Sequence, residues 1–553
     1  MKYSIKIRQI TAVAAVAMLM AIAAWAQKSD ISRNLTVFNQ LYKELNTFYV
    51  DSIDSNKAIE TAILYMLDEI DPYTEYIAEK DVKDFQSRTT GEYAGIGSYI
   101  MQRKGDVFIT GPRPGSPAEK AGLRIGDRIV KVDNDTVLGM PTDEVSKRLK
   151  GIPGTNVKVT VWRPYVGADS VLTFDITRAK IFEPSVSFAD VLPDSIGVIE
   201  LESFTQTTPE DFLEAFLKIK KFPGLKGLII DLRGNGGGLV ESAVKVLSYI
   251  LPKNTEVLRM RGRSNINEKI FKTSGRPLDT ELPIAILTDG ATASASEIVT
   301  GAVQDLDRGV VVGSRSFGKG LVQTTRQLPF DNLLKVTTAK YYIPSGRLIQ
   351  AIDYSRRNPD GSVARIPDSL TSVFHTASGR EVRDGGGITP DDTISLPDIN
   401  RLVYNLVMGN WVFDFANKYV AQHKGAFPDP GDFVITDSIY EEFKRSIDPS
   451  QFNYDRVCEV GLDGLKDLAT REGYMNDSTM AAFDVLAKLL HHDLNHDLDV
   501  NRATLEQYLA AEIVNRYAGD AGRSRVIINS DIVMRRAREI LKDKNLYRKM
   551  LKP

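Results

Sequence analysis

The residues with the clearest chemical potential lie in two short stretches, Thr292–Ile298 and Phe317–Gln323. The first contains Ser294, the second contains Lys319 and Gln323, and each stretch follows an apolar, strand-like run and a glycine. A serine becomes a nucleophile when a neighbouring base takes its proton, and a lysine is one such base where burial disfavours its ammonium form. Gln323 could orient the lysine amine by a hydrogen bond. This set of groups predicts covalent hydrolysis by a serine–lysine peptidase, without histidine.

Ser294 lies where a predicted strand at 284–287 passes through a glycine-containing loop into a predicted helix at about 294–305. Ser294 to Glu297 reads S-x-x-E, which is also a capping box, so a purely structural role stays open. The functional interpretation uses the same geometry, because the N–H groups at a helix start are unpaired and can hold an oxyanion. The N–H of Ala295, directly after the nucleophile, is the natural donor.

A second glycine-rich turn, Asp231–Gly238, follows a predicted buried strand at 228–232. Glycines permit positive φ angles and close approach of the backbone to a ligand. A tight strand-to-helix turn is the structural alternative. A dinucleotide-binding loop is disfavoured because the G-x-G-x-x-G spacing is absent. In the functional interpretation, the N–H of Gly238 is the second oxyanion donor.

Lys319 has two other interpretations. It could be a solvated loop lysine. Alternatively, Gly313–Lys319 reads G-x-x-x-x-G-K, which is close to a phosphate-binding loop, but that motif needs Ser or Thr next and Gly320 follows here.

Histidine contributes by elimination, because none of the five lies between residues 181 and 345; they are His375, His423, His491, His492 and His496. A Ser-His-Asp triad is therefore not expected. The last three histidines could bind a metal, but a solvated helical surface is the preferred interpretation.

Composition sets the broad class. A chain of 553 residues predicts about three or four domains. With 42% hydrophobic and 26% charged residues it is an ordinary globular protein, and its net charge of −2 gives no case for nucleic-acid binding. Cys458 is the only cysteine, which excludes an internal disulfide, and the sequence has no CxxC or Cys/His zinc spacing.

The N-terminus has the pattern of a secretion signal. Basic residues Lys2, Lys6 and Arg8 precede an apolar run that ends Ala-Trp-Ala at Ala26. We expect a signal peptide over 1–26, with an uncleaved membrane anchor as the alternative. Both place the bulk of the protein outside the cytoplasm.

The remaining chain changes character in steps. Residues 27–88 show helical apolar spacing, and residues 89–180 show short alternating strands between glycine turns. Residues 181–397 begin with strands alternating with helices, which predicts a mostly parallel sheet, and become loop-rich after 345. Residues 398–553 are helical and highly charged.

Together the three motifs resemble those of the carboxyl-terminal processing peptidases, or tail-specific proteases, of serine peptidase family S41. The family patterns S-A-S-E-I, F-G-K-G-x-V-Q and D-L-R-x-N-x-G-G match residues 294–298, 317–323 and 231–238 in the expected order. The resemblance covers roughly residues 30 to 395. It implies catalytic roles for Ser294, Lys319 and Gln323, with Gly238 and Ala295 as the oxyanion hole.

The resemblance also implies a fold. Residues 181–397 resemble a crotonase- or ClpP-like ββα protease core of α/β class. Residues 89–180 resemble an inserted PDZ domain, flanked by helical N- and C-terminal regions. In that domain Gly95, Ile96, Gly97 and Ser98 match the loop that captures a peptide's terminal carboxylate. Val145 and Leu149 are expected to line the side-chain groove.

The implied function is a secreted serine endopeptidase that cleaves proteins near their C-termini, with the PDZ domain binding the tail and no metal or organic cofactor. The bacterial periplasm is the expected location. Polypeptide tails are the expected partners. The long extension 398–553, which short family members lack, could mediate dimerisation, limit access or dock an adaptor. The alternatives are a non-catalytic PDZ scaffold, a coenzyme A-dependent hydratase with a related core, and an esterase.

Overall fold

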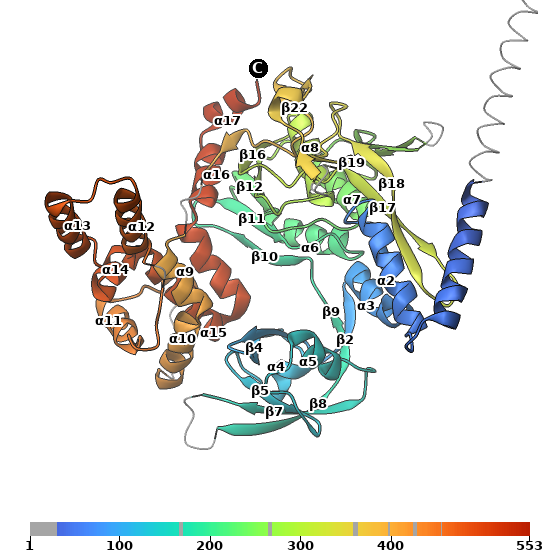
Figure 1. The fold of residues 1–553 in the computed structure, drawn as a ribbon. Helices are drawn as coiled ribbons and strands as arrows, with labels where there is room; N and C mark the ends of the chain where they lie inside the picture. The colour runs from blue at the N-terminus through green and yellow to red at the C-terminus, as the bar shows by residue number, and fades with distance from the viewer. Residues whose placement is uncertain are drawn as a thin grey trace, which may run out of the picture. The chain divides into compact units, whose positions relative to one another are not determined.

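A computed structural model describes residues 30–164, 170–263, 268–357, 363–395, 399–423, 429–454 and 456–552. The chain divides into a smaller unit, Met1–Ile77 with Thr325–Val336, and a larger unit that contains the rest (Figure 1). The predicted signal peptide lies outside the described residues. Within the described ranges, no helix combines the length and apolar character needed to cross a membrane.

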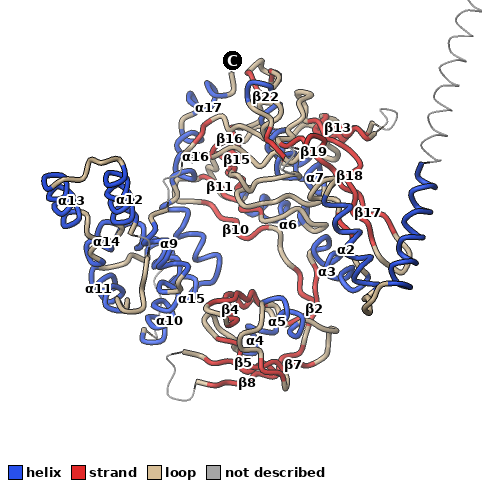
Figure 2. The backbone as a smooth tube through the Cα atoms, in the orientation of Figure 1, coloured by secondary structure: helices blue, strands red, loops and turns tan. Residues whose placement is uncertain are grey.

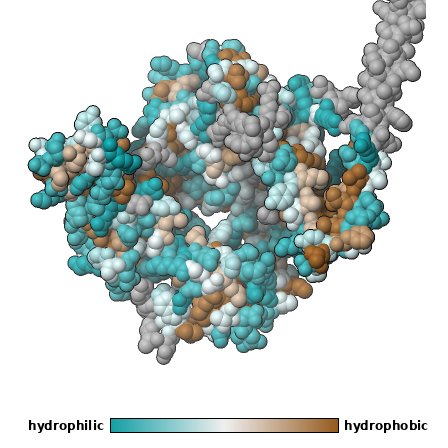
Figure 3. All heavy atoms as spheres, in the orientation of Figure 1, coloured by the Kyte–Doolittle hydropathy of each residue, from teal (hydrophilic) through white to brown (hydrophobic). Residues whose placement is uncertain are grey.

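The smaller unit is built mainly from helices, as its periodicity predicts (Figure 2). A helix over 30–48 precedes α2 (Ser55–Asp68), whose first N–H groups donate to the carboxylate of Asp54. A short strand, β1 (Glu75–Ile77), pairs antiparallel with the start of β18 (Leu333–Tyr342). The predicted apolar stripe of the first helix is exposed, and Figure 3 shows hydrophobic surface over this region.

In the larger unit, α3 (Glu79–Thr90) leads into a β-rich segment. Its sheet has the order β3-β4-β5-β7-β8, with β6 beside β5, and is entirely antiparallel. The strands are β3 (Ser98–Arg103), β4 (Asp106–Pro112), β5 (Arg128–Val132), β6 (Asp135–Thr136), β7 (Asn156–Trp162) and β8 (Val171–Thr177). Helices α4 (Pro117–Ala121) and α5 (Thr142–Leu149) pack with the sheet around one core. Strands β2 (Glu92–Gly95) and β9 (Ala179–Phe182) pair with each other, so the segment's two ends lie side by side.

The predicted parallel sheet is present, with the order β10-β11-β12-β15-β16-β23. Only β10 runs antiparallel to its neighbour. The strands are β10 (Val186–Val191), β11 (Ile196–Leu201), β12 (Gly227–Asp231), β15 (Ile284–Thr288), β16 (Val310–Gly313) and β23 (Asp392–Thr393). Buried runs such as Leu228–Ile230 explain this, since a sheet covered on both faces needs apolar residues throughout. The predicted α/β class is confirmed.

Each face of this sheet has its own helical cover. Helices α6 (Thr208–Lys220), α7 (Val240–Ile250) and α8 (Ala295–Asp305) cover one face. The second face is covered by α16 (Ile532–Lys542) and α17 (Lys544–Met550), which come from the far C-terminus. The end of the chain therefore completes the core that the middle of the chain begins.

A second sheet was largely missed by the sequence analysis, which predicted only its strand at 333–342. Strand β18 pairs with β13 (Glu256–Gly262) and β17 (Leu321–Gln327), and β14 (Lys269–Lys272) pairs with β13. The loop-rich region after residue 345 contains only short elements; these are β19 (Ile352–Arg357), β20 (Val363–Arg365), η2 (Asp368–Leu370), β21 (Val373–His375) and β22 (Glu381–Arg383).

The C-terminal extension is helical, as predicted. Its elements are α9 (Arg401–Met408), α10 (Trp411–Gln422), η3 (Pro430–Asp432), α11 (Asp437–Ser446), α12 (Val457–Arg471), α13 (Asp477–Leu489), α14 (Leu494–Val500) and α15 (Arg502–Ser530), followed by α16 and α17. Helices α9, α10, α11, α14 and α15 share one hydrophobic core.

Candidate active site

Ser294 lies at the junction between the β15 loop and α8, with the backbone in an unusual conformation. Its φ of 56° and ψ of −114° lie in a region that non-glycine residues rarely occupy. The side chain is partly buried, while Ala295 and the rest of α8 are fully buried. Such strain places a side chain at a sharp strand-to-helix turn, a geometry that can present a nucleophile.

One buried carboxylate joins the two predicted catalytic stretches. Glu297 Oε2 accepts hydrogen bonds from the backbone N–H of Ser294 at 2.8 Å and of Lys319 at 2.9 Å. Its other oxygen accepts from the N–H of Gly318 at 2.7 Å and from Ser316 Oγ at 2.5 Å. The backbones of Ser294 and Lys319 are therefore held against the same oxygen atom.

A tyrosine from the second sheet makes a further link. The Tyr341 hydroxyl lies 3.1 Å from the carbonyl oxygen of Ser294 and 2.7 Å from that of Lys319. Its ring is 1% exposed, and burial raises the pKa of the phenol well above its ordinary value, with Glu297 adding to the shift. Tyr341 thus remains a neutral donor between the two predicted catalytic stretches.

The glycines around Lys319 allow close packing. A β-carbon on Gly318 would lie 2.4 Å from the side chain of Ala351, and one on Gly320 would lie 2.9 Å from the backbone nitrogen of Gln350. The N–H of Gly320 donates to Gln350 Oε1, and a strand, β17, follows in place of a helix. The N–H groups of 318–320 are thus committed to protein acceptors, which argues against a phosphate-binding loop.

The glycine-rich turn after β12 lies against the loop at 289–294, which ends at Ser294. A β-carbon on Gly237, whose φ is 97°, would lie 2.7 Å from the carbonyl oxygen of Ala293 and 2.8 Å from the nitrogen of Ala295. The carbonyl oxygen of Asn235 accepts from the N–H of Ala293 and from Ser296 Oγ. Only a glycine at 237 permits this approach.

Two more side chains hold that turn. The carboxylate of Asp289 accepts from the N–H of Gly234 and also from the N–H of Thr292 in the loop at 289–294. Asn235 Nδ2 donates to the carbonyl oxygen of Leu201, and its Oδ1 accepts from the N–H of Gly237. The glycine-rich turn and the loop at 289–294 therefore form one hydrogen-bonded assembly.

Gly238, the other predicted oxyanion donor, is exposed and has a φ of 144°. Its backbone runs beside Phe204, and a β-carbon would lie 2.1 Å from the carbonyl oxygen of that residue. Ala295 is the first residue of α8, so its N–H has no acceptor within the helix. The structure therefore brings together the loops that carry Ser294, Ala295, Lys319 and Gly238.

Gln323 is less closely tied to this assembly. It lies in β17, and its Nε2 donates to Thr337 Oγ1 in β18 at 3.1 Å. This contact fixes the amide orientation. Its role in orienting the lysine amine stays a prediction.

The predicted peptide-binding loop precedes β3, which is an edge strand of its sheet. The carbonyl oxygens of Ile96 and Gly97 accept from the N–H groups of Ala118 and Arg113. Val145 and Leu149 are 0% and 5% exposed, so both side chains belong to the core of this segment. Their role in lining a side-chain groove stays a prediction.

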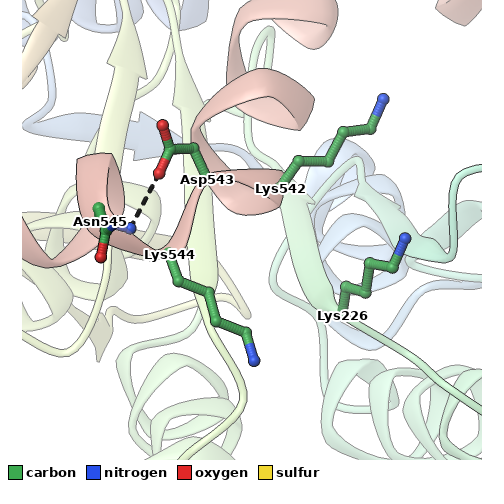
Figure 4. Close-up of a pocket in the computed structure, with 5 residues that line it drawn as sticks. All are labelled: Lys226, Lys542, Asp543, Lys544 and Asn545. Carbon is green, nitrogen blue, oxygen red and sulfur yellow. Dashed lines mark hydrogen bonds between the residues drawn. The ribbon is translucent and has the colours of Figure 1, made fainter.

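Two further places are candidate binding sites: the histidines of the C-terminal extension and an open hollow on the surface. In the described parts of the chain, no group of three or more His, Cys, Asp or Glu side chains could hold a metal ion. His492 instead contacts Asp497, and His491 contacts Glu459. An open hollow lined by Lys226, Lys542, Asp543, Lys544 and Asn545 contains none of the predicted site residues (Figure 4).

Sequence reasoning missed two residues of the assembly. Glu297 was recognised only as half of a capping box, although it also accepts from the lysine loop. Tyr341 had no local signal, because its partners lie far away in the chain and only the fold brings them together.

Comparison with known proteins agrees with the motifs. Matches to peptidase family S41, to a PDZ domain and to the helical domain described as "Probable PDZ-protease, C-terminal helical domain" cover residues 195–363, 108–163 and 402–541. A "Probable CtpA-like serine protease" of Staphylococcus haemolyticus is 33% identical over 388 residues, which are 70% of this chain and 75% of the relative. A protein of the same description from Staphylococcus aureus is 37% identical over 326 residues, covering 58% of this chain and 64% of that protein.

Among solved structures, a photosystem II D1 C-terminal processing protease is 27% identical, with a TM-score of 0.34, and covers 68% of this chain and 96% of its own. A PDZ domain of a carboxy-terminal protease from Vibrio cholerae is 30% identical, with a TM-score of 0.15, and covers 16% of this chain and 97% of its own. The sequence relatives are sufficient by themselves for the assignment, and the predicted ClpP-like ββα core is the fold of that family. This chain belongs to peptidase family S41 and is a CtpA-like serine peptidase with a PDZ domain and a helical C-terminal domain.

Proposed function

We propose that the chain is a secreted endopeptidase in which Ser294 is the nucleophile and Lys319 the general base. The observation that carries this proposal is the single Glu297 oxygen that binds the N–H groups of both residues. A carboxylate with this pair of donors holds the nucleophile and the base in a fixed relation, as acyl transfer requires.

The proposed reaction begins when Ser294 Oγ attacks the scissile carbonyl while the neutral Lys319 amine takes the hydroxyl proton. The N–H groups of Gly238 and Ala295 hold the oxyanion of the tetrahedral intermediate. As the intermediate collapses, the Lys319 ammonium gives its proton to the leaving amine. Water, activated by the same amine, then releases the acyl group and regenerates Ser294.

We further propose that the PDZ domain selects substrates by their C-termini. An extended tail would add to the free edge of β3, and its terminal carboxylate would bind the loop at Gly95–Ser98. Cleavage would then fall near the C-terminus of the bound protein. The proposal includes a periplasmic location and the predicted domain limits. It also includes a homodimer or adaptor contact through residues 398–553.

The test compares wild type with Ser294→Ala and Lys319→Met on an unstructured polypeptide with an apolar C-terminus, with mass spectrometry locating the cuts. Each substitution is expected to lower cleavage by about a thousandfold or more, because the two residues act as one unit. Lys340→Met is the matched control, since Lys340 is exposed in β18. Unchanged cleavage by Ser294→Ala would exclude that serine as the nucleophile.

A second arm uses the same polypeptide with an amidated C-terminus. Weaker cleavage of the amide by wild type is expected, because a blocked carboxylate cannot bind the loop. Equal cleavage of both polypeptides would leave the peptidase assignment intact and remove tail recognition.

A further inference from the structure

The glycine-rich turn at 234–238, here called the oxyanion turn, is linked through Arg233 to Asp531, a residue outside the protease motifs. Arg233 directly precedes the glycines of this turn, and its guanidinium contacts two carboxylates. Nε and one terminal nitrogen donate to Asp231 at 2.9 Å and 2.6 Å. The other terminal nitrogen lies 2.5 Å from Asp531 Oδ2, which belongs to the C-terminal extension.

Asp531 occupies the junction between α15 and α16. Its Oδ1 accepts from the N–H groups of Val533 and Met534 and so caps α16, while its Oδ2 faces Arg233. Each oxygen of one carboxylate therefore has a separate task. Both side chains are largely buried, with 11% exposure for Asp531 and 23% for Arg233, so solvent weakens the pair less than it would on the surface.

The junction is itself held firmly against the sheet. Ile528, Val533 and Met534 are buried in the core that α16 shares with the sheet. Ser524 Oγ donates to Glu200 at the end of β11, and Arg536 pairs with Asp392 in β23 at 2.8 Å. Asp531 is therefore a fixed point, so the ion pair restrains Arg233.

The restraint on Arg233 matters because Asn235 is the only residue between Gly234 and Gly238 with a side chain that can hold the turn. Three of the five residues after Arg233 up to Gly238 carry a positive φ, and Gly234 and Gly236 have no protein atom near the position of a β-carbon. The turn depends on its ends and on Asn235 for its conformation. A displaced Arg233 would shift the N–H groups that are proposed to hold the oxyanion.

We propose that Asp531 is a positioning residue of this peptidase: through Arg233 it fixes the oxyanion turn and couples the C-terminal helical domain to catalysis. The inference rests on the proposed function for its effect on rate. The structural link between Asp531 and the turn stands independently of that function.

The test uses Asp531→Asn in the full chain. Asparagine keeps an oxygen for capping α16 but places an NH₂ group against Arg233, so the ion pair is lost and the cap is retained. Asp543→Asn is the matched control, because Asp543 caps α17 in the same way, by accepting from the N–H groups of Asn545 (Figure 4) and Leu546. No ion pair of the described residues joins Asp543 to Arg233.

We expect Asp531→Asn to lower kcat for an unstructured polypeptide by about tenfold or more, with KM within about twofold. Asp543→Asn is expected to match wild type, and Asp531→Glu to recover part of the rate. Hydrogen–deuterium exchange should show faster exchange at residues 234–238 in Asp531→Asn alone. This exchange readout separates positioning from a general loss of stability, which would raise exchange throughout the core.

Wild-type kcat and unchanged exchange in Asp531→Asn would overturn the inference. An equal loss of kcat in both Asn variants would also overturn it, because helix stability would then explain the effect. If wild type and Ser294→Ala are equally active, the proposed function fails. The exchange measurement would still decide whether Asp531 holds the turn.

Discussion

The buried carboxylate of Glu297 determines the local order of the candidate active site. Four donors converge on it, three from the backbone and one from Ser316. Burial raises its pKa to about 7, although these hydrogen bonds favour the charged form. A proton on this carboxyl would compete with one of the four donors, so the protonation state and the geometry of the site are linked.

The raised pKa predicts a pH dependence of stability. Between the ordinary pKa of 4.5 and about 7, the folded state holds a proton on Glu297 that the unfolded state has released. The contribution of this group to stability is therefore complete below pH 4.5, falls as pH rises to about 7 and is constant above it. Glu297→Gln should lower stability at every pH, because an amide cannot accept from all four donors. The substitution should also remove part of the loss of stability between pH 4.5 and about 7.

The measurement is the free energy of unfolding at several pH values for wild type and Glu297→Gln. Burial and the nearby Asp231 also raise the pKa of Glu200 to about 7, so Glu200→Gln is needed to separate the two carboxyls. An identical decline in wild type and Glu297→Gln would show that Glu297 does not titrate in this range.

At the residue scale, the sequence was informative where the chemistry is local. The order of Ser294, Lys319 and the glycines after Asp231 predicted which loops should meet. The bridge from Glu297 to the loop at 316–319 could not be predicted, because S-x-x-E explains the same glutamate by capping alone. The pair of Arg233 and Asp531 was equally hidden, since two opposite charges far apart in a sequence carry no distance information.

At the scale of the elements, the β3 edge and the loop before it are the features that suit a peptide tail. Gly97 has a φ of 75°, and a β-carbon there would lie 2.6 Å from the β-carbon of Ser116. The loop therefore requires glycine for two reasons, conformation and space. Its shape is fixed by two hydrogen bonds, in which its carbonyl oxygens accept from the N–H groups of Arg113 and Ala118.

Gly97→Ala should consequently distort the loop and weaken binding of a peptide with a free C-terminal carboxylate by about tenfold or more. Gly105→Ala is the control: Gly105 also has a positive φ, of 87°, but nothing lies within 4 Å of its β-carbon position. Fluorescence anisotropy with full-length Ser294→Ala protein would measure both without cleavage. Equal affinity in Gly97→Ala and Gly105→Ala would place tail binding elsewhere.

The elements themselves were predicted unevenly, for a physical reason. Strands β11, β12, β15 and β16 of the parallel sheet are almost entirely buried and read as short apolar runs, so their positions were predicted, whereas the less buried β10 and β23 were not. Strands β13, β14 and β17 carry charged or polar residues along much of their length; β13 is mostly half-buried, and β14 and β17 are mostly exposed. Only β18, with its longer run, gave a recognisable pattern.

At the scale of the larger unit, the C-terminal extension consists of two parts with different roles. Helix α17 supplies Tyr547 to the core under the parallel sheet, and α16 supplies Val533, Met534, Ala537, Ile540 and Leu541. The Tyr547 hydroxyl accepts from the N–H of Ile284 in β15 at 3.0 Å. By contrast, α12 has no buried residue and α13 has only Phe483.

This difference predicts opposite outcomes for two deletions. Removing residues 532–553 would expose one face of the parallel sheet and leave the apolar side chains of β12 and β15 in water, so the protease core should fail to fold or aggregate. Replacing residues 457–489 with a Gly/Ser linker of about ten residues should leave the melting temperature of the core and the cleavage rate within about twofold of wild type. Thermal unfolding followed by circular dichroism, together with polypeptide cleavage, measures both.

A stable, active protein without residues 532–553 would show that α16 and α17 are accessory to the core. Loss of activity with an intact core after the second deletion would instead assign α12 and α13 a direct part in presenting the substrate.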